Sequence, residues 1–429
     1  MTDVLAITVL GAYRLLGRVA VPLLPFALSW RARRGKEDRA RLGERFGRAS
    51  VPRPAGRLAW VHAASVGETI AVMPLVKKLT ESGFAVVFTS VTTTSAGIAA
   101  TRLPPGACHQ FAPVDAPPLV DRFLNHWRPD LALFVESELW PTAIVKLSAS
   151  RIPQVLVNAR LSQRSYGGWR RFSGVARSLF GRIPLCLAQS AKDADRYRAL
   201  GAPRVVVTGN LKFDVPAPNV DAKALALFRA ATAERPVWVA ASTHDGEETV
   251  VAETHRALRN RFPDLLTIIV PRHPDRGEAI QADLGALGFG LARRSRTDAI
   301  DAGTEIYIAD TLDELGLFYR AAPIAFLGGS LITHGGQNPI EPLQLACAVL
   351  HGPHVENFSD IYAAIDGCQA APMISDAPSL ANALAALLAD PGAARAHAEA
   401  VAVALRPFSG ALSATMVELD PYLTQAGRP

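Results

Sequence analysis

The chain has 429 residues, 49% of them hydrophobic and 20% charged, which is enough for two folded domains and excludes a disordered chain. Its four cysteines, Cys108, Cys186, Cys347 and Cys368, form no closely spaced pair, so neither a disulfide framework nor a cysteine zinc site is expected. Twelve of the 45 Lys and Arg but only four of the 39 Asp and Glu lie in residues 1–57, a net charge of +8. The near-neutral remainder argues against nucleic acid as a partner, because nucleic-acid binders spread basic residues over their folded face.

Residues 1–30 are predicted to associate with a membrane. The stretch 4–28 is strongly apolar, but Arg14 and Arg18 interrupt it and two prolines follow. Its longest apolar runs are about ten residues, short of the ~20 that a spanning helix needs. On a helix the two arginines share one face, which suits a segment lying in the interface with its arginines reaching lipid phosphates. A tilted spanning helix is the alternative.

A basic cluster follows this segment and consists of Arg31, Arg33, Arg34 and Lys36. We expect it to face an anionic membrane surface, since such residues attract acidic headgroups by about 1 kcal/mol each. Positive-inside reasoning then leaves the folded body in the cytoplasm. A secretory signal peptide is not expected, because no Lys or Arg precedes the apolar stretch and no cleavage site is clear.

From residue 58 onward, short apolar runs alternate with helical patterns, which predicts two doubly wound α/β domains with parallel sheets. We expect strands at 58–63, 85–90, 131–135, 154–158, 184–188, 204–208, 237–241, 265–270, 305–308, 324–327 and 348–351. The proline-broken stretch 214–219 is interpreted as the linker between the domains. Ligands in such folds bind at the carboxyl ends of the strands, so we expect a site in a cleft between two facing domains.

The segment 326–342 combines a strand, two glycine pairs and a helix start at Asn338 and Pro339 that carries Glu341. Glycines let a backbone approach a ligand closely, and a helix start offers free N–H groups to a phosphate. The pattern favours a nucleotide-sugar site with residues 328–330 lining it. Its spacing matches neither the dinucleotide fingerprint nor the P-loop, so neither NAD nor ATP is indicated.

Other polar clusters follow the expected strands, and their motifs occur in one known family. The motifs are Ser65-Val-Gly-Glu68, Glu138-Leu-Trp-Pro141, Asn158-Ala-Arg-Leu-Ser162, Leu211-Lys-Phe-Asp214 and Pro271-Arg-His-Pro274. With them the chain resembles, over nearly its whole length, the 3-deoxy-D-manno-octulosonic acid (Kdo) transferases of lipopolysaccharide synthesis. The resemblance implies a GT-B glycosyltransferase with two Rossmann-like domains. It also implies inverting, metal-independent transfer of Kdo from CMP-Kdo to a lipid A precursor, without a cofactor, at the cytoplasmic face of the bacterial inner membrane.

The resemblance also suggests how the chain is divided. Residues 1–30 would be the membrane-associating segment, and residues 31–214 the acceptor domain, whose basic cluster would face the membrane and the acceptor. Residues 215–405 would be the CMP-Kdo domain. Residues 406–429 would form a helix that returns to the N-terminal domain.

Site residues follow from the same resemblance. Glu68 matches the family's general base, and Glu136 and Lys212 match positions that stabilise the transition state. The positions that match CMP contacts are Pro271, Arg272, Leu312, Asp313, Glu314, Asn338, Pro339, Ile340 and Glu341. This chain reads Leu-Asp-Glu where the family reads Met-Gly-Glu, so Asp313 departs from the pattern, and it carries Gln337 where relatives have His. Asp193 and Asp195 imitate a metal-binding pair, but residues two apart on a helix diverge.

Two alternative functions stay open from the sequence. One is a different GT-B glycosyltransferase that uses a UDP-sugar. The other is a non-catalytic membrane lipid-binding protein on the same fold, which the presence of Glu68, Lys212 and Arg272 argues against.

Overall fold

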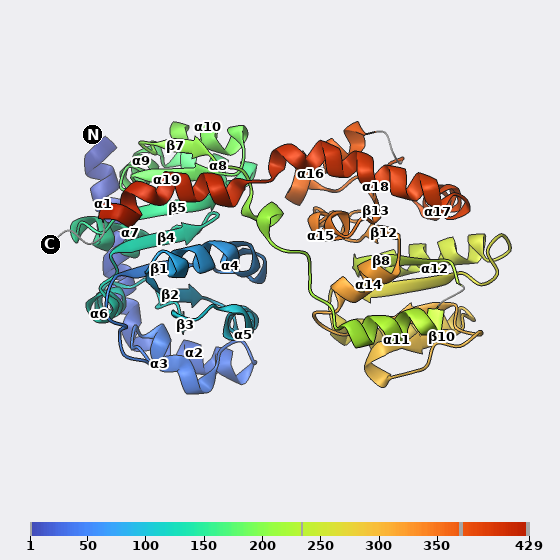
Figure 1. Cartoon of the computed structure of the whole chain (residues 1–429). Helices are drawn as coiled ribbons and strands as arrows, with labels where there is room; N and C mark the ends of the chain where they lie inside the picture. The colour runs from blue at the N-terminus through green and yellow to red at the C-terminus, as the bar shows by residue number, and fades with distance from the viewer. Residues whose placement is uncertain (1, 233–234, 369–371, 426–429) are drawn as a thin grey trace. The chain divides into compact units, whose positions relative to one another are not determined.

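The computed structural model describes residues 2–232, 235–368 and 372–425, and it divides into two compact units (Figure 1). Unit 1 comprises residues 1–215 and 408–429, and unit 2 comprises residues 216–407. Each unit contains a parallel sheet covered by helices.

The sheet of unit 1 has seven strands in the order β3-β2-β1-β4-β5-β6-β7. They are β1 (Leu58–His62), β2 (Ala85–Ser90), β3 (Ala107–Phe111), β4 (Leu131–Val135), β5 (Gln154–Ala159), β6 (Leu185–Ala188) and β7 (Val205–Val207). The order of the strands reverses at β1: β2 and β3 lie on one side of it and β4 to β7 on the other. Strand β1 pairs in parallel with both β2 and β4. Crevices at the carboxyl ends of strands form at such a reversal point.

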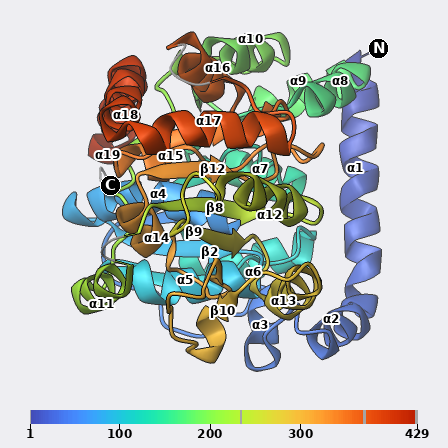
Figure 2. The same cartoon turned by 90° about the vertical axis from the view of Figure 1, so that its right-hand side faces the viewer.

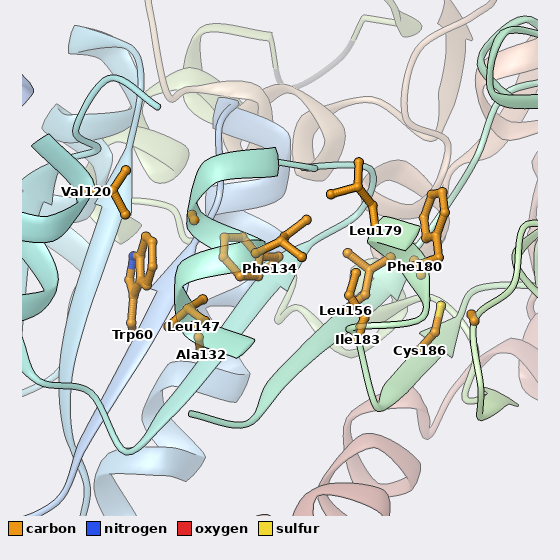
Figure 3. Close-up of a cluster of buried hydrophobic side chains, with 14 of the residues drawn as sticks. Trp60, Val120, Ala132, Phe134, Leu147, Leu156, Leu179, Phe180, Ile183 and Cys186 are labelled. Carbon is orange, nitrogen blue, oxygen red and sulfur yellow. The ribbon is translucent and has the colours of Figure 1, made fainter. Parts of the chain in front are cut away.

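Helices cover both faces of this sheet. They are α1 (Thr2–Ala20), α2 (Leu24–Arg33), α3 (Leu42–Arg45), α4 (Val66–Glu81), α5 (Thr93–Arg102), α6 (Pro117–Trp127), α7 (Pro141–Ala149), α8 (Gln163–Arg171), α9 (Ser173–Phe180), α10 (Ala191–Ala199) and α19 (Ala411–Gln425), with the 3-10 turn η3 (Leu211–Asp214). Alternate side chains of each strand enter different cores, because a strand turns successive residues to opposite faces. Trp60 and Phe134 pack under α6, α7 and α9 (Figure 3), whereas Val61 and Leu133 pack under α4 and α19.

Helix α1 is docked on the folded body of unit 1 (Figure 2). Ala6 and Leu10 are buried, and the helix packs along α9 and touches α6. The hydroxyl of Tyr13 donates a hydrogen bond of 3.1 Å to Asp115. Two helical stretches of the described chain are long and apolar enough to cross a membrane, Ala6–Arg33 and Pro391–Thr424, but the second contributes buried side chains to the cores of both units.

The sheet of unit 2 has six strands in the order β10-β11-β9-β8-β12-β13. They are β8 (Val237–Thr243), β9 (Leu266–Pro271), β10 (Leu291–Arg293), β11 (Ile306–Ile308), β12 (Ile324–Leu327) and β13 (Ala348–His351). The helices are α11 (Ala222–Thr232), α12 (Glu247–Leu258), α13 (Gly277–Ala286), α14 (Leu315–Ala321), α15 (Ile340–Gln344), α16 (Ser359–Gly367), α17 (Ala377–Ala389) and α18 (Pro391–Leu405). Here the order of the strands reverses at β8, which lies between β9 and β12 and pairs in parallel with both.

All eleven strands expected from the sequence are present, with ends that differ by at most two residues. Two strands were missed, β3 and β10, and both lie at an edge of their sheet. An edge strand is covered less completely and can carry polar residues, so its apolar pattern is weak. Strand β3 reads Ala-Cys-His-Gln-Phe and β10 has only three residues.

Candidate functional site

Glu68 lies in the first turn of α4, at the carboxyl end of β1. Ser65 caps this helix: its hydroxyl accepts from the N–H of Glu68 and donates to the Glu68 carboxylate at 2.8 Å. The N–H of Ala64 donates to the other carboxylate oxygen, also at 2.8 Å. Burial, followed by the negative charge of Glu136, raises the pKa of Glu68 to about 7, although these hydrogen bonds oppose the shift. Glu68 is therefore poised to exchange a proton near neutral pH.

Glu136 and Lys212 form an ion pair at the same edge of the sheet. Lys212 Nζ lies 2.9 Å from Glu136 Oε1, and both side chains are more than four-fifths buried. Glu136 follows β4 directly with a φ of 56°, in the left-handed region that non-glycine residues rarely adopt. Lys212 stands on η3, which is held by the N–H of Leu211 donating to Asn158 Oδ1 at 2.9 Å. The structure thus brings together residues from three distant parts of the sequence.

Sequence reasoning missed a second polar pair beside Glu68. His62 Nε2, at the end of β1, lies 3.4 Å from Glu138 Oε2, and the indole N–H of Trp140 donates to the same oxygen at 2.8 Å. Burial acts to raise the pKa of Glu138, but the hydrogen bonds of His62 and Trp140 outweigh it and the pKa lies below its usual value. Glu138 is therefore ionised at neutral pH and its charge adds to the upward pKa shift of Glu68. The available signal was the motif Glu138-Leu-Trp-Pro141.

In unit 2, Pro271 ends β9 and Arg272 follows it with an exposed side chain. The N–H of Arg272 donates to Thr243 at 2.9 Å, so it is anchored to the neighbouring strand β8. The ring of His244 lies 4.2 Å from that of His334 and 6.1 Å from that of His273. Burial, followed by the charges of His334 and His273, lowers the pKa of His244 to about 4, so its ring is neutral at pH 7.

Residues 312–314 form the turn before α14. Leu312 is 70% exposed, and Glu314 receives two hydrogen bonds from Arg294, of 2.6 and 3.0 Å. The Arg294 bonds, together with a bond from Thr311, hold the pKa of Glu314 below its usual value. Asp313 has a φ of 61°, which a glycine adopts without strain, so the backbone here suits the glycine that the resemblance implies.

The expected helix start near residue 338 is present as the short helix α15. The Asn338 side chain accepts from the N–H of Ile340 at 3.1 Å and donates to Glu341 at 3.2 Å. Pro339 is the N-cap residue and Ile340 is buried. Gln337 Nε2 lies 3.1 Å from His244 Nε2, so this segment contacts the histidine cluster at the end of β8.

The glycine-rich turn after β12, which was expected to line the nucleotide-sugar site, has three of its N–H groups bonded within the protein. The buried carboxylate of Glu247 accepts from the N–H groups of Gly329, Ser330 and Leu331, at 2.7 to 3.1 Å. It also accepts from the N–H of His244 at 2.9 Å. Glu247 is 1% exposed, so this turn is organised from inside the unit by a protein carboxylate.

The basic cluster after α1 divides into paired and unpaired residues. Arg31 pairs with the buried Glu37 at 2.8 Å, so its charge is partly used inside the fold. The guanidinium of Arg34 stacks 3.8 Å from the ring of Trp30. Arg33, Arg34 and Lys36 are exposed and form no ion pair with any carboxylate that the structure describes. These three residues are the ones that can meet an anionic surface.

Asp193 is occupied as a structural group. Its carboxylate accepts from the N–H of Leu161 at 2.9 Å and from the hydroxyl of Ser190, the N-cap of α10. In the described ranges no group of three His, Cys, Asp or Glu side chains is arranged to hold a metal ion.

Comparisons with known proteins identify the fold and the family. The structure of UDP-GlcNAc 2-epimerase from Neisseria meningitidis bound to UDP-GlcNAc is similar to this chain with a TM-score of 0.59. It has 13% identity, and the match covers 86% of this chain and all of that one. A glycosyltransferase from Rickettsia africae has the same TM-score at 14% identity, covering 87% of this chain and all of that one. At such identities the likeness concerns the fold alone, that of GT-B proteins.

Sequence similarity is more specific. The model of the family described as 3-deoxy-D-manno-octulosonic-acid transferase (kdotransferase) matches residues 40–215. The 3-deoxy-D-manno-octulosonic acid transferase of Haemophilus influenzae is 36% identical over 394 residues, which cover 90% of this chain and 92% of that protein. The enzyme of the same name from Bordetella pertussis is 35% identical over 428 residues, covering 96% and 99%. The chain therefore belongs to the 3-deoxy-D-manno-octulosonic acid transferases, a family of glycosyltransferases.

Proposed function

We propose that this chain transfers Kdo from CMP-Kdo to a lipid A precursor in lipopolysaccharide biosynthesis, with inversion and without a metal ion. Family membership supports the reaction, and one observation supports the chemistry: the carboxyl group of Glu68, with a pKa of about 7, stands beside the Glu136–Lys212 pair. An inverting transfer needs one base for the acceptor hydroxyl. A base with a pKa near the working pH is ionised in a large fraction of molecules and still accepts a proton readily.

In the proposed step, Glu68 takes the proton of the acceptor hydroxyl while that oxygen bonds to the anomeric carbon of Kdo. The bond between this carbon and the phosphate oxygen of CMP breaks, and CMP leaves with the electron pair. Positive charge develops on the sugar ring and negative charge on the phosphate. Glu136 and Lys212 present one charge of each sign in a partly desolvated place, where preorganised charges act strongly.

For the donor, we assign phosphate binding to Arg272 and the contacts with the rest of CMP to residues 312–314 and 338–341. Arg272 is exposed and forms no ion pair within the described residues, so its fork-shaped guanidinium is available for two phosphate oxygens. The neutral ring of His244 is anchored by Gln337 and can exchange hydrogen bonds with a ligand without adding charge. Glu314 is already held by Arg294, so we assign it a positioning role in the turn.

The lipid acceptor brings the chain to the cytoplasmic face of the bacterial inner membrane, and α1 supplies the contact. Its buried face and the Tyr13–Asp115 hydrogen bond fix it on unit 1, while Ile7, Leu16 and Val19 are each at least 66% exposed. A helix that is docked along one side cannot also cross the bilayer without leaving its place. We therefore assign α1 to the plane of the interface, with Arg33, Arg34 and Lys36 near the headgroups.

The test combines the purified chain, CMP-Kdo and a lipid A precursor, with mass spectrometry of the lipid product. Wild type should add Kdo, and Glu68→Gln should lower the rate by about 10²- to 10⁴-fold while CMP binding is retained. Tight binding of UDP in preference to CMP would favour the UDP-sugar alternative. Full transfer by Glu68→Gln would exclude the proposed base.

A further inference from the structure

Helix α8 lies in the most basic part of the folded body. From residue 139 to 192 the chain contains nine Lys and Arg and no Asp or Glu, a run that the near-neutral total of the body conceals. Three of these residues, Arg164, Arg170 and Arg171, stand on α8, and all three are exposed. None of them forms an ion pair with a carboxylate in the part of the chain that the structure describes. Exposed guanidinium groups concentrated on one short helix can bind an anionic group through charge-assisted, bidentate hydrogen bonds.

The two sides of α8 differ in character. Tyr166 and Trp169 pack against the core cluster of unit 1, and the Trp169 ring meets Phe180 edge-on at 5.6 Å. Arg164 and Arg171 are seven residues apart, two turns of the helix, and therefore share one side. This side is opposite the two aromatic residues, so it is the outward one. Arg170 lies between the two sides, with its guanidinium 5.7 Å from the Tyr166 ring.

Gly167 and Gly168 stand between the two outward arginines. A glycine inside a helix costs about 0.5–1 kcal/mol relative to alanine. Neither glycine has a left-handed φ, and a Cβ added to either would meet no atom within 4 Å. Packing within the chain therefore does not require them. Because they have no side chain, they leave space at the helix surface between two guanidinium groups, and a bulky anionic group can approach there.

The segment that leads into α8 is linked by hydrogen bonds to the segment that carries Glu136. It follows β5 after three residues, and the Tyr197 hydroxyl lies within hydrogen-bonding distance of both the Arg160 and Glu136 carbonyl oxygens, at 3.1 and 3.3 Å. The position of α8 is thus tied to that of Glu136. On its other side α8 leads into α9, and α1 packs along α9 (Figure 2). Ile7, Leu16 and Val19 of α1 are exposed. Along the chain, α8 thus stands between a segment that is hydrogen-bonded to the Glu136 segment and the helix against which α1 packs.

We propose that Arg164, Arg170 and Arg171 bind a phosphate group on the headgroup of the acceptor glycolipid. The inference rests on the proposed function and extends it, because it names the acceptor feature that is recognised and the residues that recognise it. Arginine suits this role since its planar fork binds two phosphate oxygens at once. The bound phosphate holds the sugar hydroxyl at a fixed distance from Glu68. Acceptors with a phosphate are then selected over those without one.

The test measures transfer in neutral detergent micelles, where no anionic membrane contributes. The variant Arg164→Gln/Arg170→Gln/Arg171→Gln should raise KM for the phosphorylated acceptor about tenfold or more and leave kcat within about twofold. With an enzymatically dephosphorylated acceptor, wild type should show the high KM and the variant no further change. The same three positions as lysine should restore only part of the affinity, since the charges remain but the bidentate geometry of the guanidinium is lost.

A matched control removes three exposed arginines elsewhere, Arg102→Gln/Arg259→Gln/Arg395→Gln, and should leave KM unchanged. Far-ultraviolet circular dichroism and Tm check the fold, and the single variants Arg164→Gln and Arg171→Gln replace the triple variant if it unfolds. Failure of wild type to transfer Kdo would overturn the proposed function itself. An active wild type with equal KM values in all variants would overturn only the role of α8. Loss of sedimentation with anionic vesicles at an unchanged KM would also overturn it, in favour of bulk lipid binding.

Discussion

Glu68 and Glu247 occupy equivalent places in the two units. Each stands in the first turn of the helix that follows the strand at which the sheet order reverses, β1 in unit 1 and β8 in unit 2. Each also accepts a hydrogen bond from an N–H in the turn before its helix, that of Ala64 or that of His244. The two carboxylates nevertheless differ in the number of hydrogen-bond donors and in the charges around them.

Glu247 is surrounded by donors, since four N–H groups point at it and three of them come from the glycine-rich turn after β12. Glu68 has two donors and faces the charges of Glu136 and Glu138, which raise its pKa. The comparison teaches that one local motif serves two purposes. A carboxylate with full hydrogen bonding holds a loop, whereas a carboxylate with too few donors and negative neighbours is ready for a proton.

A second arrangement also occurs in both units: a tryptophan and a histidine contact the hydroxyl of one threonine. In unit 1 the indole of Trp60 and the ring of His62 both contact the Thr89 hydroxyl, at 2.8 and 2.9 Å. In unit 2 Trp238 and His255 both contact the Thr267 hydroxyl at 2.8 Å. His62 stands at the carboxyl end of its strand and reaches Glu138, but His255 stands on α12 and lies 3.7 Å from Glu305. In unit 1 the histidine of this arrangement therefore contacts a carboxylate near Glu68, whereas in unit 2 it contacts Glu305.

The largest expected effect is on stability and comes from Glu247→Ala. The change leaves four N–H groups without their carboxylate in a buried place, so we expect a loss of about 3–5 kcal/mol in the unfolding free energy of unit 2. Denaturant unfolding measures this loss of free energy, and CMP binding shows whether unit 2 still binds the nucleotide. Glu253→Ala, at an exposed position of the same helix, should change stability by less than about 0.5 kcal/mol. Equal stability of the two variants would contradict the role given to Glu247.

Lys212→Met tests the ion pair in unit 1 and should lower kcat by at least about 10²-fold, because the positive charge that we propose for transition-state stabilisation is lost. It should also destabilise unit 1 by about 1–3 kcal/mol, since the change removes the ion-pair partner of a largely buried carboxyl group. Lys192→Met removes an exposed lysine of the same unit and serves as the control. A normal kcat in Lys212→Met would remove Lys212 from the mechanism.

The third prediction concerns pH and the raised pKa of Glu68. The rate constant kcat/KM should fall below pH 7 toward a tenfold loss per pH unit, because only the ionised carboxylate accepts a proton. The folded pKa lies above the ordinary value of 4.5, so the stabilising contribution of Glu68 is complete below pH 4.5 and is lost as pH rises through 7. Glu68→Gln should thus be more stable than wild type above pH 7. An inflection that persists in the residual activity of Glu68→Gln would assign it to another group.

The fold and the residues at the carboxyl ends of the strands could be predicted from the sequence, but the pairing of these residues with one another could not. The strand pattern and the motif around Glu68 predicted the fold and its carboxyl-edge residues. The pairing of Glu136 with Lys212 joins positions 76 residues apart, and the approach of Glu138 to His62 depends on the parallel pairing of β1 with β4. The glycine-rich turn was expected to line the nucleotide-sugar site, and its sequence does not show that Glu247, some 80 residues earlier, accepts hydrogen bonds from its N–H groups.

The smallest expected effect is at Asp313, where the sequence departs from the pattern that the resemblance implies. Its φ of 61° places a side chain in the left-handed region, which costs about 1 kcal/mol for a residue other than glycine. Asp313→Gly should therefore stabilise unit 2 by up to about 1 kcal/mol, less the entropy that glycine adds to the unfolded chain. If the CMP contacts that we assign to residues 312–314 are made by atoms other than the Asp313 carboxylate, CMP affinity should stay within about twofold of wild type. Calorimetric titration with CMP measures this, and a clear loss of affinity would instead mean that the Asp313 carboxylate contacts the nucleotide directly.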